Sequence, residues 1–465
     1  MSNHPDIQTW IPELIYAGRR FLRDTALVTD SRGRIVELAP AGTLSSGVHL
    51  KNRAILPGLV NAHSHAFQRV IRGRTEYRST ETVDSFWTWR ELMYRAANTL
   101  DVEDIYVASR MAFLEMALSG ITAVGEFHYL HHDPKGQPYN DRNLIAKEVI
   151  RAANDVGLRI ALLRVAYERA GYNQERNPLQ KRFIESPENY ISNLELLHSD
   201  IDNNPSASIG AAPHSVRAVS LDYLKIVNEY ASRHDLPMHM HVAEQPAEVS
   251  ACIEEHGRSP VALLDTEGLL SDRFTAVHAI HVTPKAIAAI ARTGATVCAC
   301  PTTERNLGDG VIPADAYVEN QVPVCLGTDS HAQIELLEDA RELEYHLRLQ
   351  RKERNVLAPN DEQDRSALAK RLLECATANG ARSLGFNGGQ VDVGAPADFF
   401  TVDLNDPSIA GASEDDLLSN IVFSLSRTAI KDVVVQRKRI VEDGHHQQEE
   451  EIVEEFKSLQ SKLSQ

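Results

Sequence analysis

The sequence feature that most constrains the fold is a repeated alternation between helical patterns and short apolar runs. Residues 101–119 carry apolar positions at helical spacing and stop at Gly120, and residues 142–156 stop in the same way at Gly157. Glycine is a frequent helix terminator, and strands that alternate with helices form parallel sheets. The candidate strands lie near residues 55–62, 121–127, 158–166, 207–213, 236–242, 274–280, 295–300 and 322–327. Eight such strands predict an α/β fold built on a TIM-like (β/α)8 barrel.

Short β segments occupy the two ends of the chain. Residues 26–29 and 34–38 form strand patterns on either side of a turn signal, and strand patterns return beyond residue 385. We therefore expect the two ends to pair into one small β domain beside the barrel. The expected boundaries are residues 1–57 plus 386–443 for this domain, 58–385 for the barrel and 444–465 for an exposed acidic C-terminal helix or tail. At the start of this tail, His445 and His446 are expected to be solvated.

The charge balance limits the classes of partner. The chain has 48 basic and 65 acidic residues, which gives a net charge of −17. A protein that binds nucleic acid or an anionic membrane needs a basic face, so we expect neither partner. A small acidic substrate remains compatible, because a pocket can be locally positive on an acidic protein. No apolar run reaches about 18 residues, the length that a membrane-spanning helix needs.

The cysteines and the first residues of the chain indicate a cytoplasmic location. Five cysteines are few for 465 residues, the number is odd, and their spacing matches no zinc ribbon. Cys298 and Cys300 belong to an apolar run, which favours a place in a strand core over a pair of metal ligands. The first residues lack the basic and apolar segments of a signal peptide. We therefore expect a cytoplasmic protein with reduced thiols.

The strongest local motif is the pair His63 and His65, which follows the apolar run 55–60. Side chains two residues apart in a strand point to the same face, so both imidazoles can reach one ion. This position is the carboxyl end of the first barrel strand, where the active sites of such barrels lie. An isolated pair of this kind is more often two polar loop residues, so the motif needs support from elsewhere in the chain.

That support comes from three other strand ends. The segment from His239 to Glu244 follows the fifth candidate strand, with a second histidine at position 241. His278 ends the sixth candidate strand, and Asp329 follows the eighth. The carboxyl ends of the strands meet at one end of a barrel, so these side chains are expected to converge. Imidazole and carboxylate ligands suit zinc, with iron or manganese as rivals.

With these residues the sequence resembles the amidohydrolase superfamily, and the flanking β segments resemble the small β-sandwich domain of those enzymes. The resemblance covers residues 10–440. Within the superfamily the chain resembles the formimidoylglutamate deiminases (formiminoglutamate iminohydrolases) of histidine degradation. The stretches that carry this resemblance are residues 61–69, 85–90, 126–129, 212–217, 241–245, 300–310 and 327–331.

The resemblance implies one divalent metal ion per chain, most simply Zn²⁺, with Fe²⁺ or Mn²⁺ as alternatives. Family members place a ligand three residues before a catalytic glutamate, which selects His241 before Glu244 and leaves His239 a structural role. The implied ligands are His63, His65, His241 and Asp329. Residues 208–214 contain no lysine, so a bridging carbamylated lysine is absent there and a mononuclear site is expected.

The resemblance also implies a reaction. Water activated by the metal attacks the formimidoyl carbon of N-formimidoyl-L-glutamate, and Asp329 and His278 take the proton of that water. Glu244 passes a proton to the nitrogen, which leaves as ammonia, so that N-formyl-L-glutamate is the product. Glu244, His278 and Asp329 are therefore the expected catalytic residues.

The substrate carries two carboxylates, which predicts fixed cations in the pocket. Arginine forks suit carboxylates best, and Arg217, just past the fourth strand, is the first candidate. Arg90 follows an aromatic segment expected to cover the barrel mouth and is the second. The expected hydrogen-bonding residues are Gln68, Tyr129 and His214. Alternative carboxylate partners in the same region are Arg69, Arg72, Arg74 and Arg78. A homodimer is also expected.

Two other functions compete with this prediction. The first is a deaminase of the same superfamily that acts on guanine, 8-oxoguanine or an adenosine derivative, which shares the metal ligands and Glu244. Such an enzyme needs aromatic stacking and hydrogen bonds to a purine edge in place of arginines. The second is a non-catalytic scaffold that keeps the barrel but has lost the metal. A scaffold of this kind should lack one or more ligands, whereas this chain has the full set.

Overall fold

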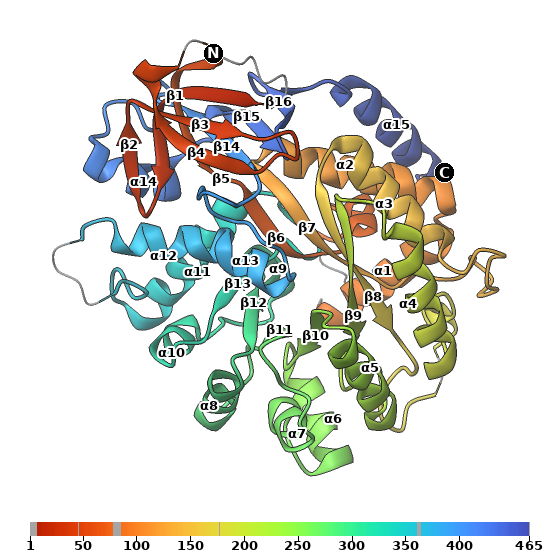
Figure 1. Cartoon of the computed structure of the whole chain (residues 1–465). Helices are drawn as coiled ribbons and strands as arrows, with labels where there is room; N and C mark the ends of the chain where they lie inside the picture. The colour runs from red at the N-terminus through yellow and green to blue at the C-terminus, as the bar shows by residue number, and fades with distance from the viewer. Residues whose placement is uncertain (1–6, 45, 78–84, 176, 360–363, 465) are drawn as a thin grey trace.

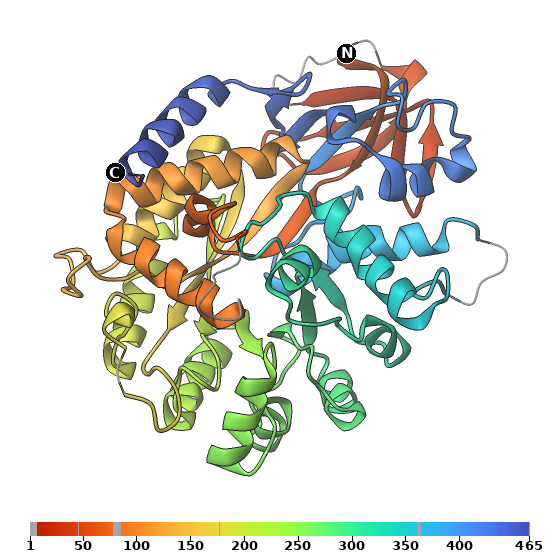
Figure 2. The same ribbon diagram turned by 180° about the vertical axis from the view of Figure 1, so that it is seen from behind.

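A computed structural model describes residues 7–44, 46–77, 85–175, 177–359 and 364–464. Eight parallel strands, β6 to β13, lie side by side in chain order, with helices around them (Figures 1 and 2). A parallel bridge between Ser64 and Asp329 joins the first strand to the loop after the last, so the barrel is nearly closed. The strands are β6 (Leu59–Ser64), β7 (Ile121–His128), β8 (Arg159–Ala166), β9 (Ala207–Pro213), β10 (Met238–Val242), β11 (Phe274–His278), β12 (Thr296–Ala299) and β13 (Val324–Leu326). The predicted α/β barrel is confirmed.

The helices that follow and surround the strands begin and end largely where the sequence signals them. Gly157 and Gly294 end two of them in the left-handed conformation, with φ of 95° and 74°, which glycine adopts without strain. The helices before the C-terminal region are α1 (Phe86–Thr99), α2 (Val102–Leu118), α3 (Leu144–Val156), α4 (Pro187–Ile201), α5 (Leu221–Arg233), α6 (Pro246–His256), α7 (Pro260–Thr266), α8 (Pro284–Thr293), α9 (Pro301–Leu307), α10 (Ala314–Glu319), α11 (Leu336–Arg351), α12 (Ala367–Ala376) and α13 (Ala378–Ser383).

The two ends of the chain form one mixed sheet of nine strands, as predicted (Figure 1). Strand β14 pairs antiparallel with β5, so a C-terminal strand joins the N-terminal ones. Trp10 packs edge-on against Phe399 across this junction, with ring centroids 5.3 Å apart. The strands are β1 (Gln8–Ala17), β2 (Arg20–Arg23), β3 (Thr25–Thr29), β4 (Ile35–Pro40), β5 (Val48–Pro57), β14 (Phe399–Asp403), β15 (Ile430–Val435), β16 (Lys438–Glu442) and β17 (His445–His446). Helix α14 (Glu414–Ser424) lies between β14 and β15.

The first candidate strand, residues 55–62, belongs to two sheets. Its first residues end β5 of the mixed sheet, and the barrel strand β6 begins only at Leu59. Gly58 is the junction, and a Cβ atom there would lie 2.2 Å from the Oγ1 atom of Thr122, so no larger residue fits. The apolar pattern continues through this junction because both sheets are buried, and hydrophobicity alone therefore hides the break.

The predicted acidic C-terminal helix is present, but one of its faces is buried, and the prediction of a solvated His446 is wrong. Helix α15 (Glu449–Lys462) packs on α2 (Figure 1). Arg110 of α2 forms ion pairs with two acidic residues of α15, Glu451 at 3.1 Å and Glu455 at 2.8 Å. His446 is buried, and its Nε2 atom lies 3.0 Å from the carbonyl oxygen of Val156. The helix residues that face the barrel are Ile452, Phe456 and Leu459.

Two further observations concern the whole described chain. Within the described ranges, no helix combines the length and the apolar character that crossing a membrane requires. The five cysteines are all described, all buried and all free of disulfide bonds.

Candidate metal centre and active site

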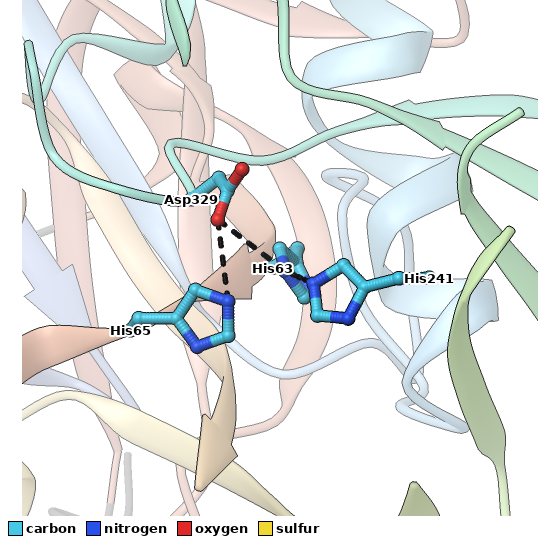
Figure 3. A group of neighbouring side chains, drawn as sticks. All are labelled: His63, His65, His241 and Asp329. Carbon is cyan, nitrogen blue, oxygen red and sulfur yellow. Dashed lines mark hydrogen bonds and ion pairs between the residues drawn. The ribbon is translucent and has the colours of Figure 1, made fainter. Parts of the chain in front are cut away.

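Four buried side chains converge at the carboxyl end of the barrel, and Figure 3 shows them pointing toward one another. One ligand atom from each lies within 4.8 Å of the others. The Oδ1 atom of Asp329 is 3.6 Å from His63 Nε2 and 3.3 Å from His65 Nε2. His241 Nε2 is 3.1 Å from His63 Nε2. The structure thus brings together the four residues predicted as metal ligands.

Hydrogen bonds orient two of the imidazoles toward this centre. His65 Nδ1 lies 3.0 Å from the carbonyl oxygen of Phe127, and His241 Nδ1 lies 3.2 Å from that of His214. A carbonyl accepts only from N–H, so each ring carries a proton on Nδ1 and turns its Nε2 toward the centre. Burial lowers the pKa of His63 to about 3 and the pKa of His241 well below its usual value. Neutral imidazole is the form that binds metal.

The fourth ligand, Asp329, is ionised. Burial by itself raises the pKa of this carboxyl, but hydrogen bonds from His63 and His65 outweigh burial and hold the pKa well below its usual value. Three imidazoles and one carboxylate form a donor set that suits zinc in a catalytic site. The residues present therefore fit a single divalent ion.

The predicted catalytic residues Glu244 and His278 lie beside this centre. His278 Nε2 is 3.7 Å from Glu244 Oε1 and 3.6 Å from Asp329 Oδ2. Burial raises the pKa of Glu244 to about 7. Burial opposes the charged form of His278, but nearby carboxylates, Glu244 first, outweigh it and raise the pKa of His278 to about 10. A carboxyl that titrates near neutral pH is suited to accepting and donating a proton.

One pocket connects the centre to the predicted substrate-binding residues. Its lining includes the catalytic pair Glu244 and His278 and three of the four metal ligands, His65, His241 and Asp329. His63 is fully buried and lies outside the lining. The five predicted substrate-binding residues all line it: Gln68, Arg90, Tyr129, His214 and Arg217.

Both arginines of this pocket are placed to attract an anion. The Arg90 guanidinium stacks over Trp87, 4.4 Å from the ring centroid, and its Nε and Nη1 atoms have no hydrogen-bond partner within the described part of the chain. Arg217 Nη1 donates to the carbonyl oxygen of Ala170 at 3.3 Å. Burial opposes the charge of Arg217, but Tyr167 and Tyr94 outweigh it, so its pKa is raised and the group stays cationic.

Comparisons with known proteins agree with this geometry. Residues 54–444 match the amidohydrolase family. The chain belongs to this family. It is 37% identical to the formimidoylglutamate deiminase of Pseudomonas aeruginosa over 92% of this chain and 95% of that protein. It is 27% identical to the 5-methylthioadenosine/S-adenosylhomocysteine deaminase of Haloarcula marismortui over 93% of each chain.

Solved structures support the same assignment. An amidohydrolase from Brucella melitensis superposes with a TM-score of 0.91 at 32% identity, over 98% of this chain and 100% of that one. An adenosine deaminase from Xanthomonas campestris with bound Zn superposes with a TM-score of 0.83 at 23% identity, over 98% of each chain, and shows the shared fold. The chain is therefore an amidohydrolase-superfamily hydrolase with a histidine-rich metal-binding site.

In this amidohydrolase a buried glutamate supports the first two ligands. Glu126 accepts a hydrogen bond from the Ser64 hydroxyl at 2.5 Å and one from the backbone N–H of Ala66 at 2.7 Å. These contacts fix the backbone on either side of His65. Burial raises the pKa of Glu126 to about 7. The sequence signal that reveals this role is a carboxylate among the apolar and small residues of the run 121–127.

A second glutamate holds the backbone at the catalytic carboxyl. Glu248 accepts from the backbone N–H of Ala243 at 3.2 Å and from that of Glu244 at 3.1 Å. Sequence reasoning missed this residue, because its partners are backbone groups that carry no signature. Ala243 is also one of several non-glycine residues with positive φ around the site, at 51°, together with His278 at 68° and Asp329 at 45°. Such conformations cost about 1–3 kcal/mol each and persist where surrounding contacts enforce them.

The predicted substrate-binding residues Gln68, Arg90, Tyr129, His214 and Arg217 are called the recognition wall below, and sequence reasoning missed two tyrosines and a glutamine that belong with them. The hydroxyls of Tyr94 and Tyr167 lie 3.2 Å apart, and Gln180 Nε2 donates to both, at 3.0 and 2.8 Å. Tyr167 packs edge-on against His214, with ring centroids 4.8 Å apart. These residues come from α1 and from the loop after β8, so only the folded chain brings them to Arg217.

The alternative arginines Arg69, Arg72 and Arg74 lie outside the pocket lining. Arg69 and Arg72 form ion pairs with Glu115 at 2.5 and 2.7 Å, and Arg74 Nη2 donates to the Gln460 side chain at 2.6 Å. Arg78 lies outside the described residues. His239, the unselected histidine of β10, has its Nε2 atom 2.8 Å from the carbonyl oxygen of Ser383, away from the four ligands.

Proposed function

We propose that this amidohydrolase hydrolyses N-formimidoyl-L-glutamate to N-formyl-L-glutamate and ammonia, a step of histidine degradation. The observation that carries this proposal is the pair Arg90 and Arg217 in the lining of the pocket that also contains the metal ligands. Two guanidinium groups suit a substrate with two carboxylates. The 37% identity to a formimidoylglutamate deiminase over 92% of the chain supports the same substrate.

We infer that His63, His65, His241 and Asp329 hold one divalent ion, most simply zinc. Such an ion acts as a Lewis acid and lowers the pKa of a bound water to about 7. The donor set and the neutral state of His63 and His241 support zinc, and the Zn bound in the Xanthomonas adenosine deaminase is consistent with it.

The protein's own groups move the protons. The Glu244 carboxyl, with its pKa near 7, takes a proton from the attacking water and delivers it to the imine nitrogen, and it then carries the remaining proton of that water oxygen to the same nitrogen. The C–N bond to that nitrogen breaks and ammonia leaves, while the water oxygen becomes the formyl oxygen. His278, cationic and 3.7 Å from Glu244, stabilises the negative charge that develops between them.

The recognition wall orients the substrate for this step. Arg217 and Arg90 bind the two carboxylates, and the wall donors Gln68, Tyr129 and His214 bind the remaining polar groups. The Oε1 atom of Gln68 is buried without a hydrogen-bond partner among the described residues, so it is available as an acceptor for a substrate N–H. We further propose a cytoplasmic homodimer that uses no nucleic acid or membrane, and light scattering in solution tests the dimer.

A purine aminohydrolase is the second candidate, because aromatic side chains also line the pocket. Phe86, Trp89 and Tyr94 offer ring faces to a base, and the Haloarcula relative is a deaminase of adenosine derivatives by name. The two arginines in the pocket lining favour the dicarboxylate over the purine.

The test is ammonia release by purified, zinc-loaded protein from formimidoylglutamate, 5′-methylthioadenosine, guanine and 8-oxoguanine. Formimidoylglutamate should give the highest kcat/KM, with N-formylglutamate formed in equal amount to ammonia. A chelator should abolish the activity, and added zinc should restore it. Faster ammonia release from any of the purines contradicts the proposed substrate and supports the second candidate.

A further inference from the structure

Cys300 is a thiol beside the metal centre that the proposed reaction does not use. It follows β12 and immediately precedes α9, and it is fully buried. One ligand atom each of Cys300, His278 and Asp329 lies within 4.8 Å of the others. This group shares only Asp329 with the four ligands of the first centre.

The two oxygens of Asp329 face different groups. Its Oδ1 atom faces the first centre, 3.6 Å from His63 and 3.3 Å from His65. Its Oδ2 atom faces His278 Nε2 at 3.6 Å. One carboxylate can therefore offer one oxygen to each of two ions, as bridging carboxylates do.

His278 is oriented as metal-ligating histidines are. Its Nδ1 atom is 3.2 Å from Glu304 Oε1, and its Nε2 atom is buried without a hydrogen-bond partner in the described part of the chain. A carboxylate behind one ring nitrogen is the common arrangement that directs the other nitrogen at a metal. The same Glu304 oxygen accepts the backbone N–H of Cys300 at 2.9 Å. One buried glutamate thus positions both His278 and Cys300.

The surrounding charge favours a further cation. Glu244, Glu304 and Asp309 all lie close enough to His278 to act on one another electrostatically. Burial, which is the largest cause, and then the negative charge of Glu244 raise the pKa of Asp309 to about 9. His278 and Asp329 line the open pocket, so an ion entering from solvent can reach them.

We propose that His278, Cys300 and Asp329 form a second, weaker site for a soft divalent ion, zinc or cadmium, and that its occupation inhibits the enzyme. The Cys300 thiol and the cationic His278 each release one proton to solvent as the sulfur–metal and nitrogen–metal bonds form, because the thiolate and the neutral imidazole are the forms that bind metal. A thiolate selects zinc or cadmium over magnesium and manganese. Inhibition follows because the ion occupies His278 Nε2 and the space beside Glu244. The inference uses the metal centre of the proposed function but not its substrate.

The test is a titration of the enzyme carrying one zinc per chain with Cd²⁺. Metal analysis should show one cadmium bound with the first zinc retained. A thiolate-to-cadmium absorption band should grow in the ultraviolet in proportion, and turnover should fall with it. Mg²⁺ and Mn²⁺ at the same concentration should leave turnover unchanged. Because the band is measured on the unaltered protein, no variant is needed to decide the issue, and cadmium binding without the band overturns the proposal.

Matched cysteine variants assign the band to one residue. Cys300→Ser should keep the first zinc, lose the band and require at least about tenfold more cadmium for inhibition, since losing even a residue that only supports a ligand costs about 10- to 100-fold in affinity. Cys325→Ser is the control, because Cys325 belongs to the same buried apolar cluster but lies outside the metal-binding group. If Cys300→Ser keeps the band and the inhibition, or if Cys325→Ser loses them, the assignment is wrong.

Discussion

The metal centre and the recognition wall of this pocket are built in different ways. The ligands stand on or next to barrel strands, and backbone carbonyls fix the rings of His65 and His241. The wall comes from α1 and from loops, and the Arg90 guanidinium keeps two nitrogens without hydrogen-bond partners among the described residues. The metal ligands are therefore held in position without the substrate, whereas the wall has hydrogen-bond donors that the substrate can use.

This difference separates chemistry from selectivity. Residues at the strand ends are set by the barrel that the whole family shares, so they determine the reaction class. Residues of the wall can change without disturbing the barrel, so they determine which substrate is held. Substitutions at the metal centre should therefore change metal content and kcat, and substitutions in the wall should change KM and kcat/KM. The effects should decrease in size from the metal ligands to the wall.

The largest effect should come from a metal ligand. His241→Ala should lower zinc affinity by more than about 100-fold, beyond the cost of losing a residue that only supports a ligand, and turnover should fall with metal content. His239→Ala is the matched control, because His239 lies on the same strand but bonds to Ser383. Metal analysis and ammonia release measure both. Equal zinc loss in the two variants would contradict the assignment of His241, and not His239, as the metal ligand.

The next largest effect should come from the proton carrier. Glu244→Gln should keep one zinc but lower kcat by about 10²- to 10⁴-fold, because an amide cannot exchange the proton that a carboxyl does. Metal analysis together with steady-state kinetics checks both halves of this statement. A variant within a few-fold of the parent enzyme would remove Glu244 from the mechanism.

Arg217→Met should affect selectivity and leave the metal in place. We expect kcat/KM for formimidoylglutamate to fall by about 2–4 kcal/mol, or about 30- to 900-fold, the cost of truncating one partner of a buried charged pair. A formimidoyl compound without carboxylates should be a poor substrate for both proteins and should respond little to the change. If turnover of formimidoylglutamate is intact in this variant, the carboxylate is held by Arg90 instead.

The smallest effect should come from the hydroxyl network behind the arginines. Tyr94→Phe removes one hydroxyl that contacts Tyr167 and Gln180, and it should raise KM by about 2- to 12-fold, the cost of about 0.5–1.5 kcal/mol for one hydrogen bond, with kcat unchanged. Tyr106→Phe is the control, since its hydroxyl donates to Asp155 on the outer helices. A change in kcat alone would place Tyr94 in the chemical step.

Much of the metal centre was predictable from the sequence because its signals are local, whereas the choice of His241 over His239 came from the resemblance to the amidohydrolase superfamily. The two-residue spacing of His63 and His65 and the position of Asp329 after an apolar run both follow from strand geometry. Each of the eight apolar runs overlaps a strand of the barrel. Only the first run, residues 55–62, gave a wrong strand boundary, because the chain stays buried at Gly58, where it passes from the mixed sheet into the barrel.

The residues that support the catalytic and substrate-binding side chains could not be predicted from the sequence, and the reason is physical. Glu248 bonds to backbone N–H groups, and Tyr167 meets Tyr94 across 73 positions of sequence. The arginines Arg69 and Arg72 looked available for a substrate because their partner, Glu115, lies more than 40 positions away. Contacts of this kind depend on how helices pack around the barrel, which local patterns do not specify.

The most direct test of the account compares two substrates that differ only in charge. The zinc-loaded enzyme is given formimidoylglutamate and its diamide, in which neutral amides replace both carboxylates and the formimidoyl group is unchanged. Because the wall is proposed to bind charge while the centre performs the chemistry, kcat/KM should be at least about 100-fold lower for the diamide, by analogy with the loss of a charged pair. Equal kcat/KM for the two compounds would contradict the assignment of the arginine wall to a dicarboxylate.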